Sequence, residues 1–300
     1  MIALRAFTAE PGFTPDFFRV REFLRRINAD EVITPGFLWA RWEWAFCLPY
    51  LARDFLDRIG VWEDDGAIVA LATFEAGLGE AFLVWDPRYR ELLPAMVEHS
   101  VTHLASPEGE LRFIVPDGDR ELARLLLARG FRADSRRDPN TVLDLHTDMS
   151  HAMPPGYSLR SIADGVDLAA FDRLLWRGFN HPGEPPGTEE GLEWRRHSLS
   201  SPGQDPSLNM VAVAPDGTYA AYCGVWHEPG SRYVLVEPVC TDPDFRRRGC
   251  ASAAILEALR RCAERGATEA YVGADLPVYL SLGFTPVRGS RYFARPEGSP

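Results

Sequence analysis

Lysine is missing from this chain of 300 residues, so all 32 of its basic residues are arginines. The protein therefore has no side-chain amine of its own that could act as an acceptor in a group-transfer reaction. The 43 acidic residues outnumber the basic ones and give a net charge of −11 at pH 7. Nucleic-acid binding needs a basic surface, so this balance argues against a nucleic-acid partner. The charge is compatible with a cationic ligand such as an amine, and also with simple solubility.

Long apolar segments are lacking as well. No run approaches the roughly 20 residues of a membrane-spanning helix, and the first residues do not resemble a secretory signal. The five cysteines are odd in number and include no Cys-x-x-Cys pair, which argues against a zinc site or a disulfide framework. His197 and His227 stand apart from other ligand types, so we expect no metal. These absences predict a cytoplasmic protein without a membrane partner, and we separately expect a monomer or homodimer.

The two halves of the sequence follow one plan. Each contains two apolar runs around an Asp-Gly pair (Asp65-Gly66 and Asp216-Gly217), a pattern that predicts a hairpin. In each half a third apolar run ends in Asp-Pro, and a helical stretch, a strand, a short helix and a Gly-Phe pair follow. The shared order and near-equal spacing indicate an internal repeat.

This repeat predicts the fold class and the domain boundaries. Each half opens with helices, such as the one expected after the N-cap Thr14, and continues as a hairpin and a strand–helix–strand–helix unit. We therefore expect an α/β protein of mixed α+β type, with two tandem lobes that are each a twisted mixed sheet flanked by helices. The expected lobes are residues 1–147 and 158–300, and the expected linker is residues 148–157.

A strand–turn–helix segment in the second half carries the clearest chemical signal. It reads VEPVCTDPDFRRRGCASAAILEALRR and covers residues 236–261. The first turn of a helix leaves main-chain N–H groups without partners, and the helix dipole adds positive potential there. Small residues from Gly249 to Ser252 keep this end open, and the three arginines before it attract anions. The junction is therefore predicted to bind a diphosphate.

The turn Arg246-x-x-Gly249-x-Ala251, followed by Tyr279-x-x-x-Gly283-Phe284, resembles the GNAT superfamily of acetyl-CoA-dependent N-acyltransferases. The resemblance covers the second lobe from about Tyr157, and the two-lobe layout is similar to that of tandem members such as mycothiol synthases. It implies acetyl-CoA as cofactor, with its diphosphate on the turn and its pantetheine arm on the preceding strand. The implied cofactor-binding residues are Val239, Cys240, Thr241, Arg246, Arg247, Arg248, Gly249, Cys250, Ala251, Ser252 and Tyr279.

Acyl transfer to an amine requires a proton acceptor for the amine, an oxyanion donor and a proton donor for the leaving thiolate. Tyr279 is the candidate acid, and the alternative is a packed aromatic on a short helix. That helix is expected to begin at Asp275 as N-cap, with Pro277 in its first turn. The main-chain N–H groups near Val239 and Cys240 are the candidate oxyanion donors. Cys240 as a nucleophile is a weaker alternative, because buried cysteines are usually inert.

Glu237 is the candidate base. Simple alternation along a strand would place it on one face with Leu235 and Val239. Pro238 removes a ladder donor and predicts a bulge that opens room for an acetyl group. The alternative for Glu237 is an ion pair with an arginine such as Arg232.

The first lobe departs from the motif, because Leu93 stands at the position of Gly249, Pro94 follows it, and Leu126 replaces Tyr279. We expect this lobe to have lost the chemistry. In the second lobe Asn180 and His181 belong to an acidic, Pro/Gly-rich loop and are the candidate acceptor contacts, and the alternative is an ordinary mobile surface loop.

The hypothesis is an N-acetyltransferase that moves an acetyl group from acetyl-CoA to a primary amine of a small molecule, by direct attack in a ternary complex. One alternative is the same fold with another acyl donor or a protein acceptor. The other is a non-catalytic acyl-CoA-binding sensor or scaffold.

Overall fold

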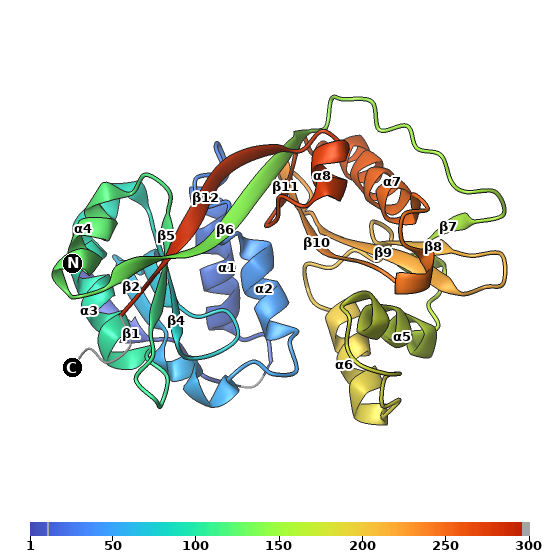
Figure 1. Cartoon of the computed structure of the whole chain (residues 1–300). Helices are drawn as coiled ribbons and strands as arrows, with labels where there is room; N and C mark the ends of the chain where they lie inside the picture. The colour runs from blue at the N-terminus through green and yellow to red at the C-terminus, as the bar shows by residue number, and fades with distance from the viewer. Residues whose placement is uncertain (11, 296–300) are drawn as a thin grey trace. The chain divides into compact units, whose positions relative to one another are not determined.

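The computed structural model describes residues 1–10 and 12–295, which form two compact units (Figure 1). Unit 1 comprises Met1–Asn140 and Pro286–Pro300, and unit 2 comprises Thr141–Thr285. The last strand of the chain therefore belongs to unit 1, whereas the lobe boundaries expected from the sequence assign it to the second lobe. Among the described residues, no helix combines the length and the apolar character that crossing a membrane would require.

Unit 1 is a mixed sheet with helices on both faces. Its strand order is β1-β2-β3-β4-β5-β12-β6, where β6 belongs to unit 1 up to Asn140. The strands are β1 (Ile2–Ala6), β2 (Gly60–Asp64), β3 (Ala67–Thr73), β4 (Glu80–Trp85), β5 (Arg112–Pro116) and β12 (Thr285–Ala294). The helices are α1 (Pro15–Ile27), α2 (Trp39–Phe46), η1 (Arg53–Arg58), η2 (Pro87–Leu92), α3 (Leu93–His103) and α4 (Arg120–Ala128). In Figure 1, α1 and α2 lie on one side of the strands and α3 and α4 on the other.

Local signals explain several of these elements. The Thr14 side chain accepts a hydrogen bond from the main-chain N–H of Phe17, which confirms the predicted cap of α1. Asp65 and Gly66 have φ values of 48° and 79°, as a two-residue hairpin turn between β2 and β3 requires.

Unit 2 repeats this plan. Its sheet has the order β11-β10-β9-β8-β7, and the end of β6 pairs with the outer side of β11. Strand β6 (Arg132–Asp144) belongs to unit 2 only from Thr141 onward. The other strands are β7 (Ser158–Ser161), β8 (Met210–Val213), β9 (Tyr219–Trp226), β10 (Tyr233–Thr241) and β11 (Glu269–Val272). The helices are η3 (Ile162–Asp164), α5 (Leu168–Gly178), α6 (Glu189–Leu199), η4 (Pro243–Phe245), α7 (Cys250–Glu264) and α8 (Pro277–Ser281). Because β10 and β11 are parallel and the other pairs are antiparallel, the predicted mixed sheet is confirmed.

The two faces of this sheet bury different clusters. Val225 of β9 packs with α7, whereas Tyr222 packs with α5 on the other face (Figure 1). Helix α5 approaches β10 closely at Gly178, where an added Cβ would lie 2.8 Å from the Cβ of Cys240. The end of α5 is thereby held against the strand that carries the candidate site.

One predicted cap is wrong. Helix α8 begins after Leu276, which provides no side-chain cap, rather than after Asp275. Pro277 does occupy the first turn, as predicted. The proline fixes the start of the helix one residue later than the acidic residue suggested, because its ring is compatible with the first helical position.

Candidate active site

The parallel strands β10 and β11 separate in the middle of the sheet. They pair over three residues only, ending with Leu235 opposite Tyr271. Strand β10 then continues to Thr241, while β11 ends at Val272. Within the described residues, the part of β10 beyond Leu235 has no pairing with β11. Its main-chain groups on that side can therefore hydrogen-bond to an extended ligand.

A bulge in β10 accompanies this separation, as the position of Pro238 predicted. The register with β9 shifts between Val236 and Val239, and the Glu237-Pro238 peptide bond is cis. Gly224 on β9 makes room for it, since an added Cβ there would lie 2.7 Å from the carbonyl oxygen of Glu237. The same oxygen accepts a hydrogen bond from the indole of Trp226 at 2.9 Å.

The bulge overturns the expected alternation of side chains. Val234, Val236 and Val239 all pack in the cluster under α7 and α8, so Val239 does not alternate with Val236 in the regular way. The sequence expectation that Leu235, Glu237 and Val239 share a face is therefore wrong beyond Val236. A register shift changes the face of every later residue, because side chains repeat every second position.

Tyr279 lies in this same cluster, on α8. Its side chain is only 6% exposed, and its ring meets Phe284 edge-on with 5.6 Å between centroids. Burial raises the pKa of Tyr279 above its usual value, and the nearby Cys223 and Glu237 raise it further. The phenol therefore stays protonated at neutral pH. Its hydroxyl makes no hydrogen bond with another side chain of the described part of the chain.

The turn between β10 and α7 exposes main-chain donors. Arg247 and Gly249 have φ values of 61° and 85°, and α7 begins directly after Gly249 without a side-chain cap. In the described structure, no main-chain acceptor takes the N–H groups from Arg247 to Ser252. A Cβ added to Gly249 would find no atom within 4 Å. Unpartnered main-chain N–H groups at an open helix N-terminus are a combination that can bind an anion.

The three arginines of the turn have different surroundings. Arg246 donates to the side-chain oxygen of Asn180 at 2.7 Å, and Arg248 donates to the Tyr157 hydroxyl at 3.0 Å. The exposed Arg247 side chain has no hydrogen bond or ion pair with the described residues, so it is available to an incoming anion.

Arg177 was missed by the sequence reasoning. Its guanidinium binds Asp242 at 2.6 Å and Asp244 at 2.6 Å, and so fixes the first half of the turn to α5. The sequence signal at this place is the Asp242-Pro243 pair, which marks Asp242 as the cap of η4 but does not identify Arg177 as its partner.

The cysteines of the site are packed. Cys240 is 5% exposed, and burial raises its pKa to about 12. Burial also raises the pKa of Cys250. Neither thiol has the exposed, electropositive setting of a nucleophilic cysteine. Cys240 and Cys250 therefore contribute main-chain groups, and not reactive thiols, to the candidate site.

The predicted acceptor residues lie beside the turn. The ring of His181 packs on Trp176 with 4.6 Å between centroids, and Asn180 contacts Arg246. Together with Pro243 they line a shallow hollow of about 260 Å³. The acidic residues of the same loop are largely neutralised, as Glu184 shows by its ion pair with Arg173 at 2.8 Å. The loop is thus less anionic than its sequence suggests.

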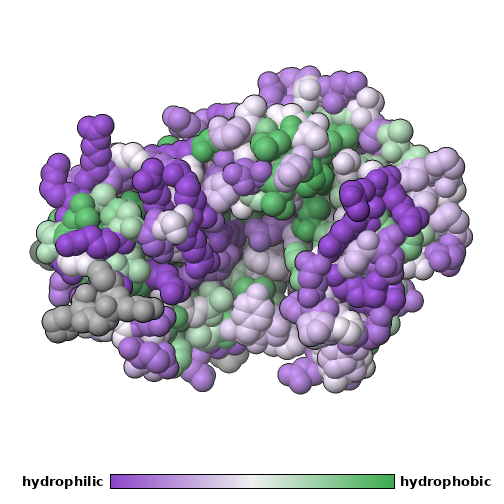
Figure 2. Space-filling model, in the orientation of Figure 1, coloured by the Kyte–Doolittle hydropathy of each residue, from purple (hydrophilic) through white to green (hydrophobic). Residues whose placement is uncertain are grey.

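An apolar surface accompanies α8. Figure 2 shows hydrophobic residues gathered over this helix, and Leu276 and Leu280 are 55% and 44% exposed. Single exposed leucines are ordinary, but two at the helix that carries Tyr279 provide apolar surface beside the candidate site.

Unit 1 has the same strand separation without the turn. Strands β4 and β5 also pair over three residues, ending with Phe82 opposite Ile114. Leu93, however, has a φ of −49° and is fully buried, as is Leu126. At Leu93, the position that matches Gly249, the described part of unit 1 therefore has a buried side chain in place of an open helix N-terminus.

Comparisons with known proteins agree with this geometry. The model of the acetyltransferase (GNAT) family matches residues 168–284. A mycothiol acetyltransferase of Clavibacter sepedonicus is 30% identical over 240 residues, which span 74% of this chain and 73% of that protein. The chain belongs to the GNAT family of acetyltransferases. A second mycothiol acetyltransferase, from Kineococcus radiotolerans, is 33% identical over 136 residues, and this match spans 43% of each chain.

A similar fold covers both units. A tandem GNAT protein from the clavulanic acid biosynthesis pathway matches with a TM-score of 0.64 at 16% identity, and covers 100% of this chain and 99% of that one. Unit 2, which contains the residues of the family match, is accordingly an acetyl-CoA-dependent N-acetyltransferase domain.

Proposed function

We propose that the protein transfers an acetyl group from acetyl-CoA to a primary amine of a small molecule, by direct attack in a ternary complex formed on unit 2. The observation that carries this proposal is the turn from Arg247 to Ser252, whose main-chain N–H groups have no main-chain partner in the described residues. Arg246, Arg247 and Arg248 add positive charge for the diphosphate, and the unpaired side of Val239, Cys240 and Thr241 would receive the pantetheine arm.

The proton transfers are assigned to two side chains. Tyr279, kept protonated by burial, would donate a proton to the sulfur of the leaving thiolate. Glu237, half-buried and electrostatically close to Tyr279, would take the proton of the attacking ammonium or amine. The main-chain N–H groups near Val239 and Cys240 would stabilise the oxyanion as the C–N bond forms and the C–S bond breaks.

The acceptor is proposed to enter past Asn180 and His181, beside the hollow at Pro243. Two relatives carry the name mycothiol acetyltransferase, so deacetylated mycothiol belongs in an acceptor panel with simpler amines. The burial of all five cysteines without a disulfide supports a reducing cytoplasm as the place of action, and we propose a monomer or homodimer.

A thiol-release assay with acetyl-CoA and this amine panel tests the proposal. We expect CoA to be released only when an amine is added, and the acetylated amine to appear in equal amount. Binding of acetyl-CoA without turnover on any amine would instead favour a non-catalytic sensor, for which the altered unit 1 is a precedent within the chain.

A further inference from the structure

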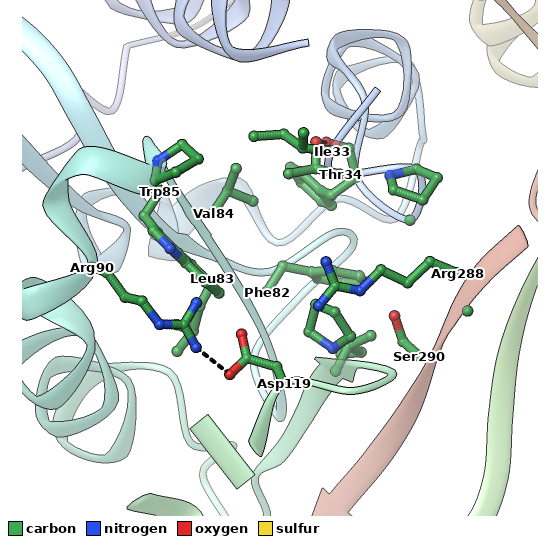
Figure 3. Close-up of a pocket in the computed structure, with 17 residues that line it drawn as sticks. Ile33, Thr34, Phe82, Leu83, Val84, Trp85, Arg90, Asp119, Arg288 and Ser290 are labelled. Atoms are coloured by element: carbon green, nitrogen blue, oxygen red, sulfur yellow. Dashed lines mark hydrogen bonds and ion pairs between the residues drawn. The ribbon is translucent and has the colours of Figure 1, made fainter. Parts of the chain in front are cut away.

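Unit 1 contains a pocket at the place where its own strands separate. The pocket has a volume of about 290 Å³ and lies beyond the last paired residues of β4 and β5, Phe82 and Ile114 (Figure 3). Its walls are mainly apolar and include Phe37, Val84 and Trp85. A volume of this size is at the lower end for small-molecule sites and holds about ten non-hydrogen atoms, judged by the ~30 Å³ that one water occupies.

An ion pair crosses the opening between the two strand ends. Arg90, which follows β4, donates to Asp119 at 2.5 Å (Figure 3). It also donates to Glu121 at 2.6 Å. Asp119 follows β5 and caps α4, where it also accepts from the N–H of Leu122. In unit 2 the corresponding Arg246 binds Asn180 instead. Because of this ion pair, and because Leu93 fills the place of Gly249, a pantetheine arm with its diphosphate has no route into the pocket of unit 1.

The lining carries one positive charge that is not neutralised. Arg90 is balanced by its two carboxylates, but Arg288 on β12 forms no ion pair with the described residues. Its Nε donates to the main-chain oxygen of Asp117 at 2.9 Å, and its two terminal nitrogens have no partner in the described structure. In Figure 3 the Arg288 side chain extends into the pocket beside Ser290, whose hydroxyl is a second donor. Two hydrogen-bond donors at one end of an apolar pocket, one of them charged, can bind a carboxylate.

From this arrangement we infer that the pocket of unit 1 binds a small apolar carboxylate, such as a medium-chain fatty acid, and does not bind a CoA thioester. The hydrocarbon contacts Phe82, Val84 and Ile114, and the carboxylate accepts hydrogen bonds from Arg288 and Ser290. The residues that line this pocket all belong to unit 1. The inference can therefore be supported or refuted independently of the proposed acetyl transfer.

Calorimetric titration of the full chain with octanoate tests the inference, with 1-octanol as the uncharged ligand of the same length. We expect octanoate to bind more tightly than octanol, and acetyl-CoA at saturation to leave octanoate binding unchanged. Arg288→Gln should weaken octanoate binding by about tenfold or more, since hydrogen bonds between charged groups are lost. Arg288→Gln should leave acetyl-CoA binding within twofold of the unaltered chain.

Arg291→Gln is the matched control. Arg291 is also an exposed arginine of β12 that contacts Asp117, through Nε at 3.2 Å, but it does not line the pocket. It should therefore leave octanoate binding unchanged. The inference is overturned if octanoate does not bind, if octanol binds equally well, if both arginine variants have the same effect, or if acetyl-CoA displaces octanoate.

Discussion

Gly249→Ala tests two requirements at one position, which are a positive φ and open space for a phosphate. The φ of 85° at this position disfavours any residue with a Cβ, so alanine should lower the free energy of unfolding by about 1–2 kcal/mol. The new methyl group meets no protein atom within 4 Å, and therefore causes no clash within the chain. It stands instead where a phosphate must approach the main chain. Loss of two hydrogen bonds to a charged group, at roughly 1.5 kcal/mol each, would raise the Kd for acetyl-CoA about 100-fold or more.

Gly266→Ala is the control for the effect of a positive φ alone. Gly266 lies just beyond the other end of α7, has a φ of 94°, and also leaves open space around an added Cβ. Both variants should lose similar stability in urea unfolding, but only Gly249→Ala should lose acetyl-CoA binding in calorimetry. If Gly249→Ala binds acetyl-CoA as the unaltered protein does, the diphosphate does not lie on this turn.

Three further variants test the rest of the site and the stability of helix α7. Tyr279→Phe should lower kcat about 100-fold and change the Kd for acetyl-CoA less than twofold, and an unchanged kcat would exclude the acid role. Because burial raises the pKa of Tyr279, ionisation of this phenol in the unaltered protein should cause no loss of rate below about pH 10. Gly224→Ala should destabilise the protein by about 1–3 kcal/mol in urea unfolding and reduce turnover, because its Cβ would force the carbonyl of Glu237 away. Glu257→Gln should reduce stability at pH 7, because two arginines on α7 lower the pKa of the native carboxyl from 4.5 to about 2. The charged Glu257 stabilises the folded protein at any pH above the pKa of this carboxyl in the unfolded chain, and the stabilisation is lost as the pH falls through its pKa in the folded protein. The difference in unfolding free energy between Glu257→Gln and the unaltered protein should therefore shrink between pH 4.5 and pH 2.

Local chemistry made part of this fold predictable from sequence. The cap at Thr14, the Asp65-Gly66 hairpin and the helix start at Gly249 each depend on a few neighbouring residues with distinctive conformational preferences. The mixed sheet followed from the repeated order of such segments. These features are set by steric limits on φ and by main-chain hydrogen bonding, both of which can be recognised in a short window of sequence.

Long-range choices were not predictable in the same way. Strand β6 begins in unit 1 but its last residues pair with β11 in unit 2, and β12 follows unit 2 in sequence but pairs with β5 in unit 1. Nothing in the composition of either strand selects one sheet over the other. The side-chain alternation in β10 was misjudged for a related reason. Pro238 signalled a bulge, but the register shift depends on contact with Gly224 across the sheet.

The repeated strand separation distinguishes what both units share from the turn that we propose binds the cofactor. Strands β4 and β5 and strands β10 and β11 each pair over three residues and then separate, so this opening belongs to the architecture of both units. What differs is the turn beyond it, which exposes main-chain donors at Gly249 but buries a side chain at Leu93. An opening of this kind is therefore compatible with different ligands, and the residues at its outer end decide between them. In unit 2 those residues fit a diphosphate, and in unit 1 the Arg90–Asp119 pair closes the same route.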